Sequence, residues 1–232
     1  MQPLAGKNIA ICIPSYDAKI TTQMASSLYV LFDLIKSHGG MVSFFVQNYT
    51  PIIPIARNLL ILEVMNNPTV TGMFMMDSDI SFQPYEALAM IAKGLSHDIV
   101  VALYRKKQEE IGYFATFMED EAGDVIVKDG LLQASRVPVG FAYINRNVIQ
   151  RLWDDSNHRI VNPGKVGEYR AIFDNEYRNG DYIGEDYVFC DKIKAAGFDI
   201  LVMPEVDLTH YGTKGYAGSY RASSEELNAR IK

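Results

Sequence analysis

The sequence is poor in cysteine and contains no long apolar run. Cys12 and Cys190 are its only cysteines, too few for a disulfide framework, and both lie in apolar surroundings, where a free thiol behaves as a small hydrophobe. No apolar run approaches the roughly 18 residues that span a bilayer, and residues 1–7 lack the apolar core of a signal peptide. We therefore expect a soluble, cytoplasmic protein in a reducing compartment, without a transmembrane segment.

Positive charge is also scarce. Lysine and arginine number 22 against 28 aspartates and glutamates, so the net charge is −6 and offers no general attraction for nucleic-acid phosphates. The short run Arg105-Lys106-Lys107 is typical of a solvated face rather than of a nucleic-acid patch. A chain of 232 residues is long enough to bury one sizeable core, and we find no repeat or linker that would divide it.

Apolar periodicity predicts alternating strands and helices over the first 103 residues. Strands are expected at 8–14, 41–47, 72–76 and 99–103, and helices between Thr21 and Gly39, over 55–65, and from Pro84 to Leu95. This alternation predicts an α/β fold with a parallel sheet covered by helices.

The pattern changes after Leu103. Residues 115–118 and 125–127 flank a turn and predict an antiparallel hairpin, and further elements are expected as a strand at 139–144, a helix at 147–153, a helix at 185–196 and a strand at 200–203. Residues 154–181 are polar and aromatic without clear period, and we interpret them as a long functional loop that shapes an acceptor site. The residues after 203 are expected to form loop and tail.

Asp77-Ser78-Asp79 places two carboxylates directly after an apolar strand. In open α/β sheets ligands bind at the carboxyl ends of strands, where such a pair can hold Mg²⁺ or Mn²⁺ and neutralise a diphosphate. A solvated turn after a strand would give the same pattern, so the motif alone is a weak signal.

Glu185-Asp186 opens a predicted helix after Gly184. Acidic residues in a first turn interact favourably with the helix dipole and need no catalytic duty. If the helix begins at the same sheet edge, one of the two carboxylates can deprotonate an incoming hydroxyl, and Asp186 is the better placed. His210 follows the last predicted strand; a lone histidine is usually no ligand, although an imidazole beside two carboxylates suits Mn²⁺.

Taken together, these motifs resemble the glycosyltransferases of the GT-A fold, and in particular family-2-like members, in their order along nearly the whole chain. Ile13-Pro14-Ser15-Tyr16 is similar to the loop that holds the nucleoside, and Arg57-Asn58 to the donor-binding segment. Asp77-Ser78-Asp79 resembles the Asp-x-Asp metal motif, Gly184-Glu185-Asp186 the motif of the catalytic base, and His210 the late metal-binding histidine. Val139-Gly140-Phe141-Ala142 resembles the acceptor-side strand.

The resemblance implies a Rossmann-like, mostly parallel mixed sheet flanked by helices in one GT-A domain. Residues 1–104 would bind the nucleotide sugar, 105–211 would form the acceptor half, and 212–232 a flexible tail. The implied activity is metal-dependent transfer from a nucleoside-diphosphate sugar to an acceptor hydroxyl with inversion. A UDP-sugar is favoured as donor over GDP- or dTDP-sugars, and the acceptor is a glycan or another hydroxyl compound.

The resemblance also implies a role for each site residue. Asp186, with Glu185 beside it, would be the catalytic base, and Gly140 and Phe141 would face the acceptor. Mn²⁺ or Mg²⁺ would bind Asp79 and His210, with Asp77 reaching the metal or the ribose. The donor would be held by Pro14, Ser15, Tyr16, Asp17, Arg57, Asp77 and Ser78.

Two other classes share parts of this pattern. The aspartyl-phosphate phosphatases also place Asp-x-Asp after an apolar strand, but normally after the first strand, whereas here it follows the third. A non-catalytic module that binds a sugar nucleotide or Ca²⁺ would use the acidic residues without turnover. Phosphatase assays and donor-hydrolysis assays separate these alternatives from a transferase.

Overall fold

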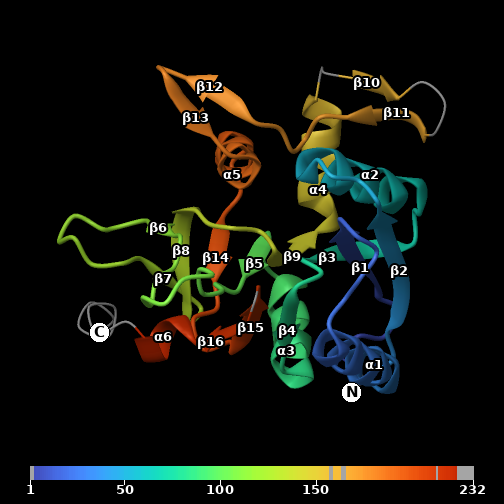
Figure 1. Cartoon of the computed structure of the whole chain (residues 1–232), viewed down its shortest axis with the longest axis horizontal. Coiled ribbons are helices and arrows are strands. Elements are labelled where there is room, and N and C mark those ends of the chain that lie inside the picture. The colour runs from blue at the N-terminus through green and yellow to red at the C-terminus, as the bar shows by residue number, and fades with distance from the viewer. Residues whose placement is uncertain (1–2, 157–158, 163–165, 213, 224–232) are drawn as a thin grey trace.

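The computed structural model describes residues 3–156, 159–162, 166–212 and 214–223. A large mixed sheet crosses the molecule in the strand order β2-β1-β3-β9-β5-β14-β8-β6, with β7 paired to β8 (Figure 1). Strands β2, β1, β3, β5 and β14 all run in one direction. The predicted fold class, a mostly parallel α/β sheet flanked by helices, is therefore confirmed.

The first half follows the predicted βαβαβ order. Its elements are β1 (Asn8–Ser15), α1 (Thr22–Ser37), β2 (Met41–Asn48), α2 (Ile53–Asn66) and β3 (Val70–Met76). The Thr21 hydroxyl accepts a hydrogen bond from the Met24 amide and caps α1, as a threonine at that position is expected to do. Both β2 and β3 pair with β1 in parallel, so the three strands end at the same sheet edge.

An antiparallel strand interrupts the sheet. The chain continues through β4 (Ile80–Phe82), α3 (Pro84–Gly94) and β5 (Ile99–Val101), and later inserts β9 (Phe141–Asn145) between β3 and β5. Strand β9 pairs antiparallel to both neighbours, so the sheet is mixed, as the resemblance implied. Helix α4 (Arg146–Asp155) follows β9, close to its predicted position.

The two strands of the predicted hairpin pair with a third strand, β8, rather than with each other. The chain turns between the bridged residues Glu119 and Val125, but β6 (Thr116–Phe117) and β7 (Val127–Lys128) both pair with β8 (Leu131–Arg136), a strand not predicted. Asp129 and Gly130, with φ of +54° and +80°, join β7 to β8. An Asp-Gly pair of this kind fits a two-residue hairpin turn, whose twist matches that of the strands.

The segment interpreted as a long loop is built of two hairpins. One comprises β10 (Arg159–Asn162) and β11 (Val166–Arg170), and the other β12 (Glu176–Arg178) and β13 (Asp181–Ile183). Asn179 and Gly180 supply the turn of the second hairpin with φ of +56° and +92°. The prediction of an irregular loop over 154–181 is therefore wrong.

The C-terminal part adds a small sheet to the large one. Helix α5 (Glu185–Ala195) and β14 (Ile200–Val202) lie where they were predicted. Beyond them, β15 (Leu208–Tyr211) pairs with β4 and with β16 (Gly215–Gly218), and α6 (Tyr220–Ser223) follows. Strands β15 and β16 occupy part of the region that was expected to be loop and tail.

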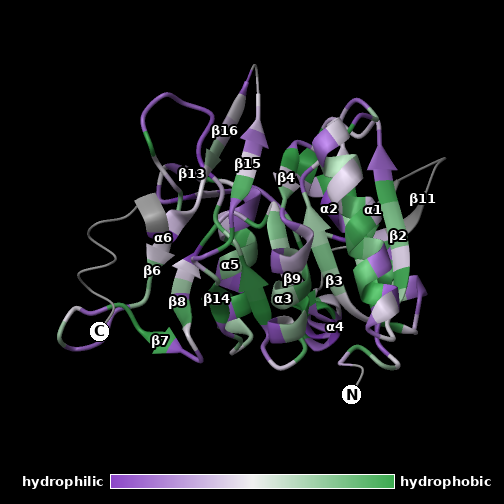
Figure 2. Ribbon diagram, turned by 90° about the horizontal axis from the view of Figure 1, so that it is seen from below, coloured by the Kyte–Doolittle hydropathy of each residue, from purple (hydrophilic) through white to green (hydrophobic). Residues whose placement is uncertain are grey.

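The core lies on both faces of the large sheet. Alternate residues of β1 face opposite ways: Ala10 and Cys12 pack with α2, α4 and α5, whereas Ile9 and Ile11 pack with α1 and α3. Figure 2 shows apolar residues concentrated on the central strands and helix faces, with hydrophilic residues in the connecting loops. Cys12 and Cys190 are free and buried, as predicted. Within the described ranges, we find no helix with the length and apolarity that a membrane span requires.

Candidate active site

A buried arginine joins the predicted acidic motifs. Arg57 lies on α2 with a side chain only 2% exposed, and its guanidinium contacts Asp77 Oδ1 at 3.2 Å, Glu185 Oε1 at 3.5 Å and Asp186 Oδ1. An arginine is rarely buried unless carboxylates pair with it. The contacts therefore tie α2, the end of β3 and the start of α5 into one closed cluster of Arg57, Asp77, Glu185 and Asp186.

Asp77 is held at the end of β3 by a close approach of the backbone. Its amide donates a hydrogen bond to the Gly140 carbonyl over 2.7 Å. A Cβ atom on Gly140 would collide with Asp77 Oδ2 and with the Tyr104 hydroxyl, which gives a physical reason for a glycine at this position. The next residue, Phe141, faces the core, where its ring packs on Phe74 at 4.8 Å between centroids. Of the predicted acceptor-side pair, only Gly140 reaches the cluster.

Burial controls the protonation of the closed cluster. It raises the pKa of the Asp186 carboxyl to about 6, with Arg57 opposing the rise and Glu185 and Asp77 adding to it. Burial likewise raises the pKa of the Tyr104 hydroxyl well above its usual range, and the Asp77 and Asp186 carboxylates reinforce it. A carboxyl with a pKa near neutrality can accept and release a proton at physiological pH.

Asp79, two positions after Asp77, forms a second cluster with Lys107 and His210, which we call the open cluster. Asp79 Oδ2 lies 2.5 Å from Lys107 Nζ, and Asp79 Oδ1 lies 3.5 Å from His210 Nε2. Burial raises the pKa of Asp79, but hydrogen bonds from His210 and Lys107 outweigh it, so that this pKa lies below its usual range. Strand pairing sets the geometry, because the Tyr211 amide donates to the Asp79 carbonyl over 2.8 Å and His210 pairs with Ile80.

The hydrogen bond of His210 assigns its tautomer. His210 Nδ1 lies 2.9 Å from the Arg105 carbonyl oxygen, and because a carbonyl only accepts, Nδ1 must donate. With Nδ1 donating, Nε2 donates to Asp79 only when the ring carries both protons, and in the neutral ring its lone pair points toward Asp79 and can bind a cation. This arrangement suits a metal ligand, whose other ring nitrogen is commonly fixed by a carbonyl.

The predicted metal site is only partly assembled. Asp79 and His210 converge, whereas the closest described cation to Asp77 is Arg57. Over the described ranges, no group of three histidine, cysteine or acidic side chains is arranged to hold a metal. Asp79 and His210 would supply two of the ligands of Mg²⁺ or Mn²⁺, a number compatible with an ion that also binds phosphates and water. Asp77 as a third ligand is not supported.

The residues predicted to hold the nucleoside lie at the same edge of the sheet as the two clusters. Tyr16 and Asp17 follow β1, Tyr49 and Pro51 follow β2, and together they line an open hollow of about 410 Å³. The Tyr49 amide donates to the Ser15 carbonyl over 3.1 Å, which holds the two strand ends together. Tyr16 and Tyr49 are 66% and 76% exposed, so both rings are free to stack on a planar ligand.

The other residues predicted to bind the donor are Pro14, Ser78 and Asp17. Pro14 is buried within β1, and Ser78 is partly buried in the turn from β3 to β4. Asp17 forms an ion pair with Lys19 over 3.1 Å, which lowers the pKa of its carboxyl.

No family model matches this chain, and no curated protein matches it. Its fold is similar to that of A197 from STIV, with a TM-score of 0.55, 14% identity, and coverage of 92% of this chain and 91% of that one. At that identity, the likeness shows the fold alone.

Two enzyme structures match with lower scores. A Drosophila β1,4-galactosyltransferase 7 in complex with manganese, UDP-Gal and xylobiose gives a TM-score of 0.46 at 12% identity, over 97% of this chain and 80% of that one. A 4-diphosphocytidyl-2C-methyl-D-erythritol synthase from Anaerococcus prevotii gives 0.36 at 11% identity, over 68% and 81%. These scores are too low to support an argument about the function of this chain.

Three residues of the site were missed by sequence reasoning. Lys107 was placed on a solvated face but contacts Asp79, Tyr104 lies against Asp77 and Gly140, and Tyr49 lines the hollow with Tyr16. A local signal existed only for Tyr49, because it follows a predicted strand at the sheet edge where ligands collect.

Proposed function

We propose that this protein is a metal-dependent, inverting glycosyltransferase that uses a nucleoside-diphosphate sugar, with a UDP-sugar favoured. The observation that carries the proposal is the convergence of Asp77, Glu185 and Asp186 on buried Arg57, at the end of the strand from which Asp79 reaches His210. Carboxylates with distinct surroundings at one sheet edge provide both a proton acceptor and a cation site.

In this proposal the chain's own residues act in three places. The rings of Tyr16 and Tyr49 stack on the nucleoside, and Asp79 and His210 lie where the diphosphate would end. Mn²⁺ or Mg²⁺, when bound there, would neutralise charge on the leaving diphosphate. Arg57 orients Asp186, whose carboxylate takes the proton of the acceptor hydroxyl.

The bonds and charges of the transfer balance. The acceptor oxygen attacks the anomeric carbon from the side opposite the diphosphate, and the bond from that carbon to the diphosphate oxygen breaks. The hydroxyl proton moves to Asp186, and the departing diphosphate keeps the bonding electrons. Attack from the opposite side inverts the anomeric configuration.

Thermal unfolding with UDP-, GDP- and dTDP-sugars, with and without Mn²⁺, tests the proposal, since a ligand that prefers the native state raises stability. We expect a Mn²⁺-dependent rise in Tm with one nucleotide class and slow release of its nucleoside diphosphate. Asp79→Asn should lose the Mn²⁺-dependent part of both effects, whereas Asp33→Asn, on α1, should keep them. If no nucleotide sugar stabilises the wild type, the proposal is wrong.

The same preparation separates the alternatives. Release of phosphate from p-nitrophenyl phosphate would favour the phosphatase. Against that alternative, Asp77 Oδ1 contacts Arg57 and Asp77 Oδ2 lies close to Gly140, so neither oxygen is placed as a free nucleophile. Stabilisation by a sugar nucleotide without any turnover would favour a binding module.

A further inference from the structure

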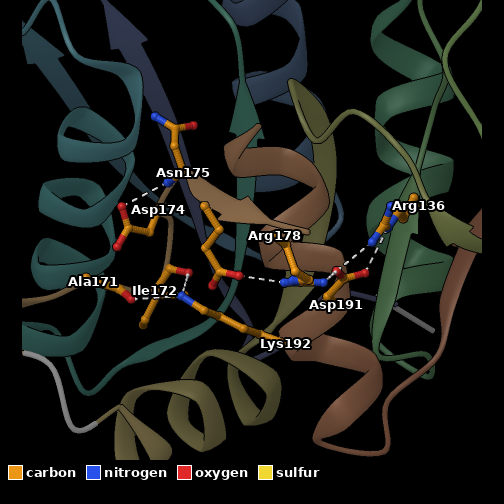
Figure 3. Close-up of polar contacts among 9 residues, drawn as sticks. Arg136, Ala171, Ile172, Asp174, Asn175, Arg178, Asp191 and Lys192 are labelled. Carbon is orange, nitrogen blue, oxygen red and sulfur yellow. Dashed lines mark hydrogen bonds and ion pairs between the residues drawn. The ribbon is translucent and has the colours of Figure 1, made fainter. Parts of the chain in front are cut away.

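Ion pairs connect the hairpin of β12 and β13 to the body of the protein. Arg178 donates to Asp191 Oδ2 over 2.7 Å and to Glu176 Oε2 over 2.6 Å, and Arg136 of β8 forms a bidentate pair with Asp191 over 2.9 and 2.8 Å (Figure 3). The network joins the hairpin to α5 and to the large sheet. Bidentate arginine–carboxylate pairs hold orientation better than single contacts do.

The opposite face of this hairpin presents two tyrosines to solvent. Tyr177 and Tyr182 are cross-strand partners, and because side chains alternate along a strand they point away from the face of Arg178. Their side chains are 82% and 59% exposed, and the ring centroids lie 5.4 Å apart at an interplanar angle of 62°. We call Tyr177 and Tyr182 the tyrosine pair.

The tyrosine pair lies next to the proposed base in the chain. Strand β13 ends at Ile183, and Gly184 leads directly into α5, whose first residues are Glu185 and Asp186. Asp186 lies four positions after Tyr182, a span of at most about 14 Å between their Cα atoms. A sugar that contacts the pair can therefore belong to the same short oligosaccharide as a hydroxyl at Asp186.

We propose that the tyrosine pair is a stacking platform for a neutral carbohydrate acceptor. A phenol ring offers an apolar face to the C–H face of a sugar and a hydroxyl to its polar edge. Arg178 lies on the opposite face of the hairpin and is already paired with Glu176 and Asp191, so it offers no free positive charge to an anionic acceptor, and a neutral acceptor is favoured. The proposal rests on the proposed function, and it narrows the acceptor class to neutral glycans.

The size of the platform favours a sugar over a protein. Burying each ring removes on the order of 150 to 250 Å² from solvent, whereas a stable protein interface needs roughly 800 Å² on each partner. Two rings alone are therefore too small for a stable protein contact, but they match one or two sugar units.

A glycan array, probed with the full chain in the presence of Mn²⁺ and UDP, tests the platform. We expect the wild type to retain neutral glycans and Tyr177→Ala/Tyr182→Ala to lose at least about tenfold in retention, as expected when two stacking contacts are removed. Tyr177→Phe/Tyr182→Phe should keep most of the retention because the ring faces remain. Tyr29→Ala, which removes a 79% exposed tyrosine on α1, is the matched control and should bind as the wild type does.

Three results would overturn the platform: no glycan retained by the wild type, equal retention by the double alanine variant, or preferential retention of anionic glycans. A fourth is a wild-type dimer in sedimentation that the double alanine variant abolishes, since the pair would then be an interface between copies of the chain.

Stabilisation of the protein by the nucleotide-sugar donor separates failure of the platform from failure of the proposed function. If it persists in a wild type that retains no glycan, only the platform fails, and if glycans bind but no donor does, the proposed function fails.

Discussion

The two acidic clusters differ in how each one is neutralised. In the closed cluster, Asp77, Glu185 and Asp186 surround Arg57, whose side chain is 2% exposed. In the open cluster, Asp79 is paired with Lys107, whose side chain is 37% exposed. A buried guanidinium has no route away from its partners, whereas an exposed lysine can swing into solvent. We therefore interpret the first cation as permanent and the second as exchangeable.

The difference suits the proposed chemistry. Under the proposed function, a permanent cation would keep Asp186 oriented as the base, as catalytic groups require. Under the proposed function, an exchangeable Lys107 would neutralise Asp79 in the absence of a metal and would leave the carboxylate free to bind a divalent ion. The predictions below test each half of this comparison.

The largest effect is expected when the permanent cation is removed. Arg57→Ala leaves the carboxylates of the closed cluster without a partner and should destabilise the protein by about 3 to 5 kcal/mol, measured by urea unfolding. Arg151→Ala is the control, because Arg151 forms only an exposed pair with Asp155 over 2.6 Å and should cost about 0.5 kcal/mol or less. A loss below about 1 kcal/mol for Arg57→Ala would mean that the cluster is not closed.

The next effect is on catalysis. Asp186→Asn keeps the shape of the side chain but cannot accept a proton, so hydrolysis of the nucleotide sugar should fall by about a hundredfold or more while donor binding persists. In the wild type the base must be deprotonated, so activity should rise with pH through about 6 and then level off. Release of nucleoside diphosphate across a pH series measures both effects. An unchanged rate in Asp186→Asn would remove Asp186 as the base.

A smaller effect is expected at the glycine beside the closed cluster. Gly140→Ala brings a methyl group against Asp77 Oδ2 and the Tyr104 hydroxyl, and the displacement should cost about 1 to 3 kcal/mol in unfolding. Gly184→Ala is the matched control, because a Cβ there meets no atom within 4 Å. Equal stabilities of the two variants would show that the approach of Gly140 to Asp77 is loose.

The smallest effect concerns the exchangeable cation. Lys107→Ala removes the competitor for Asp79, so Mn²⁺ should bind roughly two- to fivefold more tightly, as expected for the loss of an exposed ion pair. Electron paramagnetic resonance of free Mn²⁺ during titration measures the affinity without any turnover. Lys106→Ala is the control, because Lys106 lies 3.6 Å from the Phe114 ring centroid. Weaker Mn²⁺ binding in Lys107→Ala would contradict the competition.

The elements predicted from the sequence were those with strong local signals. The apolar runs and helical spacing between Asn8 and Leu103 correspond to the observed strands and helices, with ends shifted by a few residues. The insertion of β9 between β3 and β5 has no local signature, because strand order depends on contacts far apart in the sequence. The turn at Asn179-Gly180 did carry a local hairpin signal, which was overlooked in a segment interpreted as loop.

The candidate site shows the same division. The motifs around Asp77, Glu185 and His210 were recognised because each follows or begins a predicted element. Arg57 was predicted as a donor-binding residue, but its pairing with Asp186, 129 positions away, was not, and neither was the pairing of Lys107 with Asp79, 28 positions away. Such pairings follow from the packing of the whole chain, and residue type alone does not indicate them.

The antiparallel register of β15 against β4 makes the position of His210 sensitive to chain length. Successive residues of a strand face opposite sides, so a shift by a single position would turn the imidazole away from Asp79 and bring Thr209 or Tyr211 opposite Ile80. A one-residue deletion in the turn at 204–207 would therefore act as a selective lesion: it would separate the imidazole from the carboxylate and leave the strands of the large sheet in their places.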